Sequence, residues 1–206
     1  MENNTVVLIG EVLSGFTFDH EVCGEGFYLI DLAIKRLSDQ TDILPVMVSD
    51  RLLDICRDYS GQTIQVFGQY RSFNITKGNK KGLFLSIFAR EIYFLRSDLV
   101  DATKSNTITL KGFVCKTPIY RETPRGRIIT DLLLAVNRSY GKSDYIPCVI
   151  WGRNARYAAD FEVGTAVEVC GRIQSREYSK RLGDDTVETR IAYEVSVSKI
   201  NQVHEY

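Results

Sequence analysis

The chain contains the same pattern twice, and this repeat constrains the fold more than any other feature of its 206 residues. NTVVLIGEV begins at Asn4 and NTITLKGFV begins at Asn106, which is an offset of 102 residues. LAIKR and LAVNR keep this offset, as do DILPV and DYIPC. After one inserted residue the offset becomes 103, and it persists to Glu91 and Glu194. Two copies of about 100 residues predict a duplicated domain. We expect the first copy at residues 1–97 and the second copy at residues 105–203.

Each copy has the same predicted order of elements. In the second copy, runs of β-forming residues bounded by turn residues predict five strands and one short helix. The strands are expected at residues 107–116, 127–136, 144–151, 166–178 and 187–199, with the helix at 153–160. This is the order of an OB-fold barrel. We therefore predict an all-β chain of two tandem five-stranded OB-fold barrels, each with a short helix between strands 3 and 4. Gly112 and Gly171 interrupt strand patterns and are expected to mark bulges or bends.

The predicted hairpin LLLAVNRSYGKSDYIPCVIWG of the second copy carries aromatic rings among cations. Tyr140, Tyr145 and Trp151 lie on or beside it, close to Arg138 and Arg153. Rings that stack on bases, next to cations that contact phosphates, are what binds single-stranded nucleic acid without sequence preference. The alternative is that these rings pack on the barrel, as half-exposed aromatic residues commonly do.

LAVNRSY, YIPCVIWGRNARYAADF and VGTAVEVCGRIQSREYS, in that order, resemble the bacterial single-stranded DNA-binding protein (SSB) family. The resemblance covers nearly all of residues 106–203, and residues 4–95 follow the same template more faintly. It implies an OB fold, sequence-tolerant binding of single-stranded DNA, and an assembly of four OB folds that a homodimer of this chain would supply. It also implies base stacking by four rings: Tyr140, Tyr145, Trp151 and Tyr178.

The cations of the second copy follow the rings. We expect phosphate contacts, which give affinity and salt dependence without sequence information, from four arginines that adjoin the rings: Arg138, Arg153, Arg172 and Arg176. TPRGR places two more arginines in the loop between the first two strands. For Lys180 and Arg181 a solvated charged surface is a fair alternative, because Asp184 and Asp185 lie nearby.

The first copy departs from this pattern. The positions of the first copy that are equivalent to the four rings in the repeat, which we call the answering positions, hold Ser38, Ile43, Ser49 and Ile75. Residues 1–104 contain 11 Lys and Arg against 14 Asp and Glu, a balance of −3, whereas residues 105–206 contain 15 against 12, a balance of +3. We expect a structural or assembly role for the first copy and the main DNA platform in the second. Weaker contacts could remain around its fourth strand, at Tyr70, Arg71, Phe73 and Lys80.

Other functional classes find less support. His20 and His204 are the only histidines, and neither has metal or triad spacing; the five cysteines form no CxxC pair. No nucleotide-binding or hydrolase motif occurs. We expect no enzyme activity, cofactor or metal. A primosome-type OB-fold module that binds proteins, with secondary nucleic-acid binding, stays open, and so does RNA binding. Oligosaccharide binding lacks a signal peptide to support it.

The ends of the chain bear on its location and partners. No apolar run approaches the ~20 residues that span a bilayer, and the start lacks a secretory signal. We expect a cytoplasmic, nucleoid-associated protein with no membrane partner. Members of the resembled family usually end in a flexible linker and a short acidic tip that recruits replication enzymes. This sequence ends in NQVHEY, so we do not expect recruitment by that route.

Overall fold

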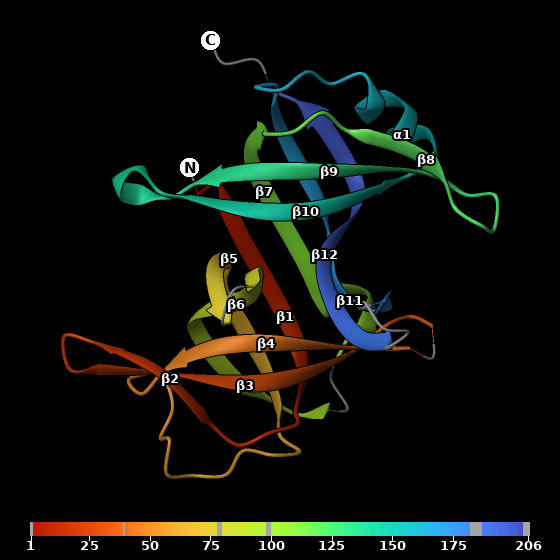
Figure 1. The fold of residues 1–206 in the computed structure, drawn as a ribbon. Coiled ribbons are helices and arrows are strands. Elements are labelled where there is room, and N and C mark those ends of the chain that lie inside the picture. Colours follow the sequence, from red (N-terminus) through yellow and green to blue (C-terminus); the bar gives the residue numbers. More distant parts are fainter. Residues whose placement is uncertain (1, 39, 78–79, 98–99, 182–186, 204–206) are drawn as a thin grey trace.

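The computed structural model describes residues 2–38, 40–77, 80–97, 100–181 and 187–203. The first copy contains β1 (Asn4–Val12), β2 (Thr17–Val22), β3 (Glu25–Lys35), β4 (Thr41–Ser49), β5 (Thr63–Lys77) and β6 (Lys80–Leu95). A 3-10 turn (Ala102–Lys104) precedes the second copy, which contains β7 (Asn106–Val114), β8 (Ile119–Glu122), β9 (Ile128–Asn137), a 3-10 turn (Ser139–Gly141), β10 (Ser143–Trp151), α1 (Gly152–Ala159), β11 (Ala166–Arg181) and β12 (Val187–Gln202). The all-β prediction is confirmed (Figure 1).

Each copy closes into a five-stranded barrel because its first strand has two neighbours in the same copy. β1 pairs with β3 and β5, and β7 pairs with β9 and β11. In the first copy the ring is completed by the pairs β3–β4, β4–β6 (parallel) and β5–β6. In the second copy it is completed by the pairs β9–β10, β10–β12 (parallel) and β11–β12. Along β7 the buried positions Ile108, Leu110, Gly112 and Val114 alternate with more exposed ones, which is the period expected of a strand with one face in the core.

The two glycines singled out in the sequence lie where barrel strands come close together. The β11–β12 register shifts between Cys170 and Gly171, so the predicted bulge at Gly171 is present. Gly112 lies at the closure of the barrel, and no register shift occurs there. A Cβ atom at Gly112 would be 2.4 Å from the carbonyl oxygen of Ala135 on β9. Only glycine permits this approach of β7 to β9.

Two details of the predicted fold are wrong. Each barrel has an additional strand, β2 or β8, that flanks it by pairing with β3 or β9. The helix predicted between strands 3 and 4 occurs in the second copy only; residues 50–62 of the first copy form turns. There, Asp54 Oδ1 accepts from the Cys56 amide at 3.0 Å and Asp58 Oδ1 from the Ser60 amide at 2.9 Å. These local bonds satisfy the backbone without a helix.

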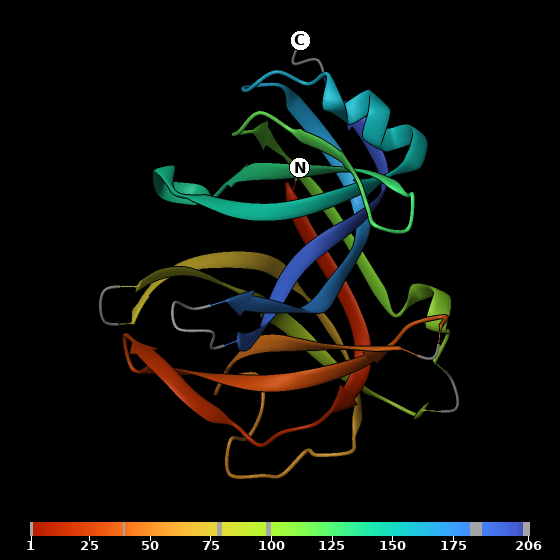
Figure 2. The same cartoon turned by 45° about the vertical axis from the view of Figure 1, so that its right-hand side comes forward.

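The two copies are joined through their first strands. β1 pairs antiparallel with β7, and Val6 lies opposite Ile108, which is the residue that answers it in the repeat. The junction therefore has an approximate two-fold axis through this pair. Asn4 accepts from and donates to the Tyr70 backbone, and Asn106 does the same to the answering residue, Ile173. One barrel lies above the other with the paired strands running between them (Figure 2).

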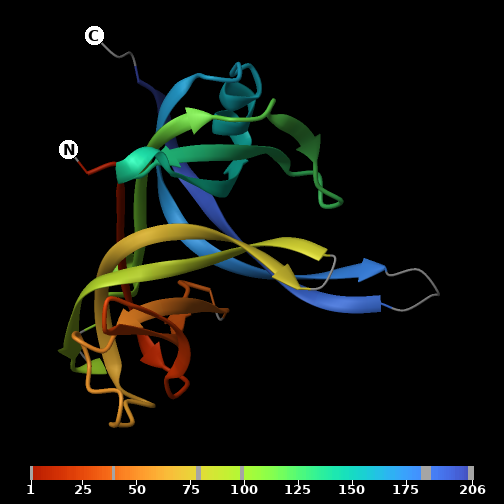
Figure 3. The ribbon, with the colours of Figure 1, turned by 60° about the vertical axis from the view of Figure 1, so that its left-hand side comes forward.

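The long hairpins β5–β6 and β11–β12 project from the same side of the molecule (Figure 3). Each one reaches the opposite copy. Ser72 of β5 contacts Tyr145 of β10, and Ser175 of β11 contacts Ile43 of β4. None of the helices in the described part of the chain is long and apolar enough to cross a membrane.

Candidate nucleic-acid interface

Strand β10 presents two of the predicted rings on its outer face. Ile146, Cys148 and Ile150 point into the barrel and are at most 1% exposed. Because side chains alternate along a strand, Tyr145 and Trp151 point outward, and they are 44% and 36% exposed. The sequence predicts both rings on one strand, and in the structure they also lie on the same outward face of that strand.

Tyr140 lies at the tip of the β9–β10 hairpin, in the 3-10 turn. Its side chain is 100% exposed, and its φ of 66° is in the left-handed region, as is the φ of 69° at Gly141. A tyrosine rarely adopts this conformation, and such backbone strain is often found in binding loops. The turn holds the ring in solvent, where nothing in its own barrel covers it.

The indole of Trp151 is held by one hydrogen bond, from its Nε1 to Ser196 Oγ at 3.2 Å. In the last strand of each copy the pairing gives an offset of 108 residues, because Met47 pairs with Phe88 and the answering Val149 pairs with Ser196; the offset of 103 predicted at Glu91 and Glu194 is therefore wrong. By this pairing the large and small residues are exchanged in the first copy, with Ser49 in place of Trp151 and Phe88 in place of Ser196. Phe88 lies beside Phe27, with ring centroids 5.7 Å apart, and His20 stacks on Phe27. The first copy therefore fills with its own side chains the region where the second copy offers a ring.

Tyr178 lies near the end of β11, opposite Arg190 of β12, in the outer part of the hairpin that projects toward the first copy. It is 37% exposed, and the Arg176 guanidinium lies 6.0 Å from its ring centroid. Arg176 also forms an ion pair with Glu194 at 3.4 Å, yet half of its side chain stays exposed. Arg153 is exposed in the first turn of α1, two residues after Trp151.

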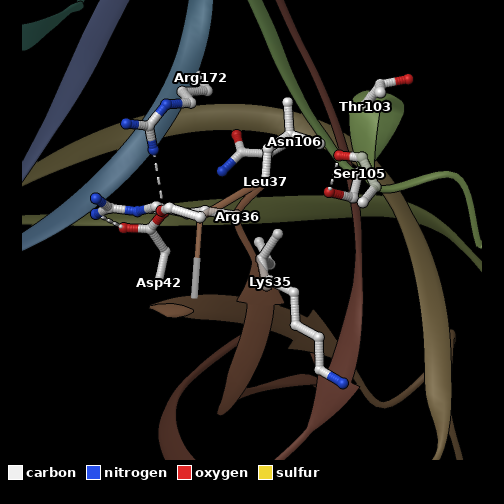
Figure 4. Close-up of a pocket in the computed structure, with 11 residues that line it drawn as sticks. Lys35, Arg36, Leu37, Asp42, Thr103, Ser105, Asn106 and Arg172 are labelled. Atoms are coloured by element: carbon white, nitrogen blue, oxygen red, sulfur yellow. Dashed lines mark hydrogen bonds and ion pairs between the residues drawn. The ribbon is translucent and has the colours of Figure 1, made fainter. Parts of the chain in front are cut away.

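Two fully buried carboxylates bind the copies together. Asp144 accepts hydrogen bonds from Arg138 of its own copy and from Arg71 and the Ser72 amide of the first copy. Asp42 makes the matching contacts with Arg36, Arg172 and the Ser175 amide. Asp42 and Asp144 are 0% exposed. Figure 4 shows the second of these clusters, with Arg172 pointing from β11 onto Asp42 and Arg36.

These networks change the interpretation of three predicted contacts. Three arginines were expected at the DNA surface: Arg138, Arg172 and Arg71. Each instead forms an ion pair with a buried carboxylate between the copies. Burial lowers the pKa of Arg71 and of Arg172, and the nearby Arg36 lowers that of Arg172 further. The hydrogen bond to Asp42 raises the pKa of Arg36. Asp42 and Asp144 are the residues that the sequence interpretation missed.

The residues predicted to make weaker contacts in the first copy lie in different environments. Tyr70 is wrong as a surface residue: its side chain is 1% exposed, its hydroxyl makes no hydrogen bond among the described residues, and burial raises its pKa. Phe73 is half-buried beneath the Arg138 guanidinium, which lies 5.2 Å from the ring centroid. The Lys80 side chain lies outside the described residues. Within the described chain, no three His, Cys, Asp or Glu residues are grouped as metal ligands.

The fold and the rings together define a protein with two joined OB folds, of which the second exposes an aromatic and cationic surface. Residues 105–202 match the model of the single-strand binding protein family. This match covers nearly all of the second copy and agrees with the sequence resemblance.

Curated relatives agree with this assignment. The chain is 35% identical over 96 residues to "Single-stranded DNA-binding protein 2" of Listeria innocua, covering 43% of this chain and 60% of that protein. It is 34% identical over 96 residues to "Single-stranded DNA-binding protein A" of Bacillus subtilis, covering 43% of this chain and 56% of that protein. The matched region thus spans little more than half the length of these relatives.

A solved structure extends the likeness in fold to both copies. The single-stranded DNA binding protein of Thermus aquaticus superposes with a TM-score of 0.78, covering 98% of this chain and 94% of that chain. The sequences are 20% identical, so this similarity shows the fold alone.

Proposed function

We propose that this protein binds single-stranded DNA without sequence preference and protects it during replication, recombination or repair. The observation that carries the proposal is the outward exposure of Tyr140, Tyr145, Trp151 and Tyr178 in the second copy. Each ring can stack on a base, and every base has a π-face. The exchange of Trp151 and Ser196 for Ser49 and Phe88 supports a second copy that acts as the main platform.

The phosphate contacts in this proposal are fewer than the sequence suggested. Arg153 and Arg176 keep exposed guanidinium groups beside the rings, whereas Arg138 and Arg172 hold the copies together. The names of the Listeria and Bacillus relatives, both single-stranded DNA-binding proteins, add support for the ligand class.

Titration with oligo(dT) tests the proposal, because Trp151 is the only tryptophan of the chain. We expect its emission to be quenched on binding, since contact with a stacked base gives the excited indole a non-radiative path to its ground state. Affinity should fall as salt rises, with a slope of about −0.7 per phosphate contact in a plot of log K against log salt. Unchanged emission together with no shift in a gel would contradict the proposal.

We further propose that two chains associate, so that the assembly contains four OB folds. The neighbouring strands β5, β1, β7 and β11 form a wide sheet, and its outer face carries the half-buried apolar side chains of Val7, Ile9 and Phe67. Such a face can be covered by the same face of a second copy about a two-fold axis.

Sedimentation equilibrium tests this association. The unmodified protein should have the mass of two chains at micromolar concentration. Val7→Glu places a charge on the outer face without touching the barrel core, and this variant should have the mass of one chain. A single-chain mass for the unmodified protein at every concentration would contradict the dimer.

The proposed activity is binding and not catalysis, and the proposed location is the cytoplasm, where single-stranded DNA would be the partner. Nothing in the proposal depends on an acidic terminal segment. Incubation of pure protein with labelled single-stranded DNA and Mg²⁺ should leave the DNA intact.

A further inference from the structure

A groove of about 700 Å³ lies between the two copies, on the side of the β11–β12 hairpin. The second copy contributes four of its prominent side chains, Arg125, Arg127, Trp151 and Arg176. The first copy contributes Arg36, Gln40, Thr41 and Ile43, from the turn between β3 and β4 and the start of β4. The groove therefore exists only because the two barrels are joined.

The groove is basic. Five arginines line it, and Glu177 is the one carboxylate residue among its described lining. Asp42 beneath the groove balances Arg36 and Arg172. In the described part of the chain Arg125 and Arg127 have no carboxylate within ion-pair distance, so their charges are available to a ligand.

A second hollow of about 270 Å³ adjoins the groove. Thr123, Pro124, Arg125, Arg127 and Trp151 line it. Trp151 and the two arginines belong to both hollows, so the indole lies at their junction. A chain that stacks a base on Trp151 can therefore continue in either direction beside the arginine loop.

The repeat provides an internal comparison for this groove. On the opposite side of the molecule, the positions that answer Arg127, Trp151 and Arg176 are Glu25, Ser49 and Phe73. Glu25 there forms an ion pair with Arg51 at 3.3 Å. Among the described residues, the side with Trp151 therefore combines an exposed ring with two arginines that form no ion pair, Arg125 and Arg127, whereas Ser49 and the paired Glu25 lie at the answering positions.

We propose that this groove carries a single nucleic-acid strand from Trp151 onto the first copy, with phosphates on Arg125, Arg127 and Arg176 and polar contacts from Gln40 and Thr41. The inference rests on the proposed function. It also changes the role of the first copy, which becomes one wall of the binding path as well as a structural partner. Phosphate groups match the charge of the groove, and polar side chains such as Gln and Thr commonly contact the sugar–phosphate backbone.

Two substitutions on the first copy test the path. Gln40 Oε1 accepts from Arg36 Nη1 at 2.8 Å, and Gln40→Glu keeps this acceptor while it adds a negative charge. In the double variant Gln40→Glu, Thr41→Glu, we expect about a tenfold loss of affinity for an oligo(dT) of about 35 nucleotides. An oligo(dT) of about 6 nucleotides, which a single OB fold can hold, should keep its affinity within about twofold.

Thr17→Glu, Gln62→Glu is the matched control, because it adds the same two charges to the first copy at residues outside the groove. Equal affinities of the control and the double variant for the long oligonucleotide would overturn the path while leaving the proposed function intact. Failure of the unmodified protein to bind either oligonucleotide would overturn both.

A second measurement does not depend on affinity. Ile43 lines the groove and is 43% exposed. Ile43→Trp in a Trp151→Phe background gives a single indole on the first copy. We expect the long oligonucleotide to quench it at saturation. Unquenched emission with the oligonucleotide bound would overturn the proposal.

Discussion

Replacing Trp151 and Tyr178 together by alanine is expected to lower the affinity for oligo(dT) by about 30-fold or more. Stacking contributes ~1–3 kcal/mol per base, so the loss of two stacked bases costs at least ~2 kcal/mol. Both rings are more than one-third exposed, so their removal leaves the barrel core intact. Fluorescence anisotropy of a labelled oligonucleotide measures the effect, because the variant has no tryptophan of its own.

The control for this experiment is a second pair of exposed tyrosines. Tyr93 on β6 and Tyr157 on α1 are 51% and 48% exposed, and neither lies at a predicted stacking position. The variant Tyr93→Ala, Tyr157→Ala should bind oligo(dT) within about twofold of the unmodified protein, since surface substitutions have small effects. A comparable loss in both variants would mean that Trp151 and Tyr178 have no particular role in binding.

Periodicity predicts the barrel strands well, because each has one buried face. The flanking strands β2 and β8 are not predicted, because they have no buried face that alternates with an exposed one. Every residue of β8, Ile119–Glu122, is exposed, so the segment has no alternation to detect. It forms because β9 offers a free edge. The missing helix of the first copy has a local cause, since Asp54 and Asp58 favour turns that the second copy lacks.

The outward rings could be predicted because they differ between the copies. The buried network of Asp42 and Asp144 could also have been predicted, from residues that are identical in the two copies. Arg36 and Arg138 are the same residue in both copies, as are Asp42 and Asp144, and Ser72 and Ser175. Identity between copies indicates a role that both copies share. Here that role is their mutual contact, and Arg138 was a poor candidate for a function of the second copy alone.

Neither the differences nor the identities between the two copies predict the groove. Its walls come from the β3–β4 turn of the first copy and from the Arg125 loop and strands β10 and β11 of the second copy. They meet only because β1 and β7 pair about the axis through Val6 and Ile108. A one-residue change in that register would turn the outer side chains of one strand inward. Sequence patterns within each copy contain no information on this pairing.

Arg138→Ala distinguishes a structural role from a DNA contact. If Arg138 acts only on Asp144, the variant should lose stability while the salt slope of oligo(dT) binding stays the same. A phosphate contact would instead reduce that slope by about 0.7. The affinity for oligo(dT) measured between low and moderate salt separates the two outcomes, and a reduced slope with unchanged stability would return Arg138 to the DNA surface.

Asp144→Ala is expected to lower the free energy of unfolding by about 3–5 kcal/mol. The change leaves the guanidinium groups of Arg138 and Arg71 in a site where each is only 20% exposed, and it removes the acceptor of the Ser72 amide. Removing one partner of a buried ion pair costs this much because the remaining charge is desolvated without compensation. Urea denaturation measures the loss, and the answering variant Asp42→Ala should lose a similar amount.

Asp131→Ala is the matched control, because Asp131 pairs with Arg121 on the surface of the same copy. That ion pair has an N–O distance of 2.5 Å, and both side chains are about one-third to one-half exposed. An exposed ion pair contributes ~0–1 kcal/mol, so this variant should be nearly as stable as the unmodified protein. If Asp144→Ala were no more costly than Asp131→Ala, the β1–β7 ladder and the apolar core would suffice to join the copies. A large difference would instead mean that the buried carboxylates fix the two barrels in the arrangement that forms the groove beside Trp151.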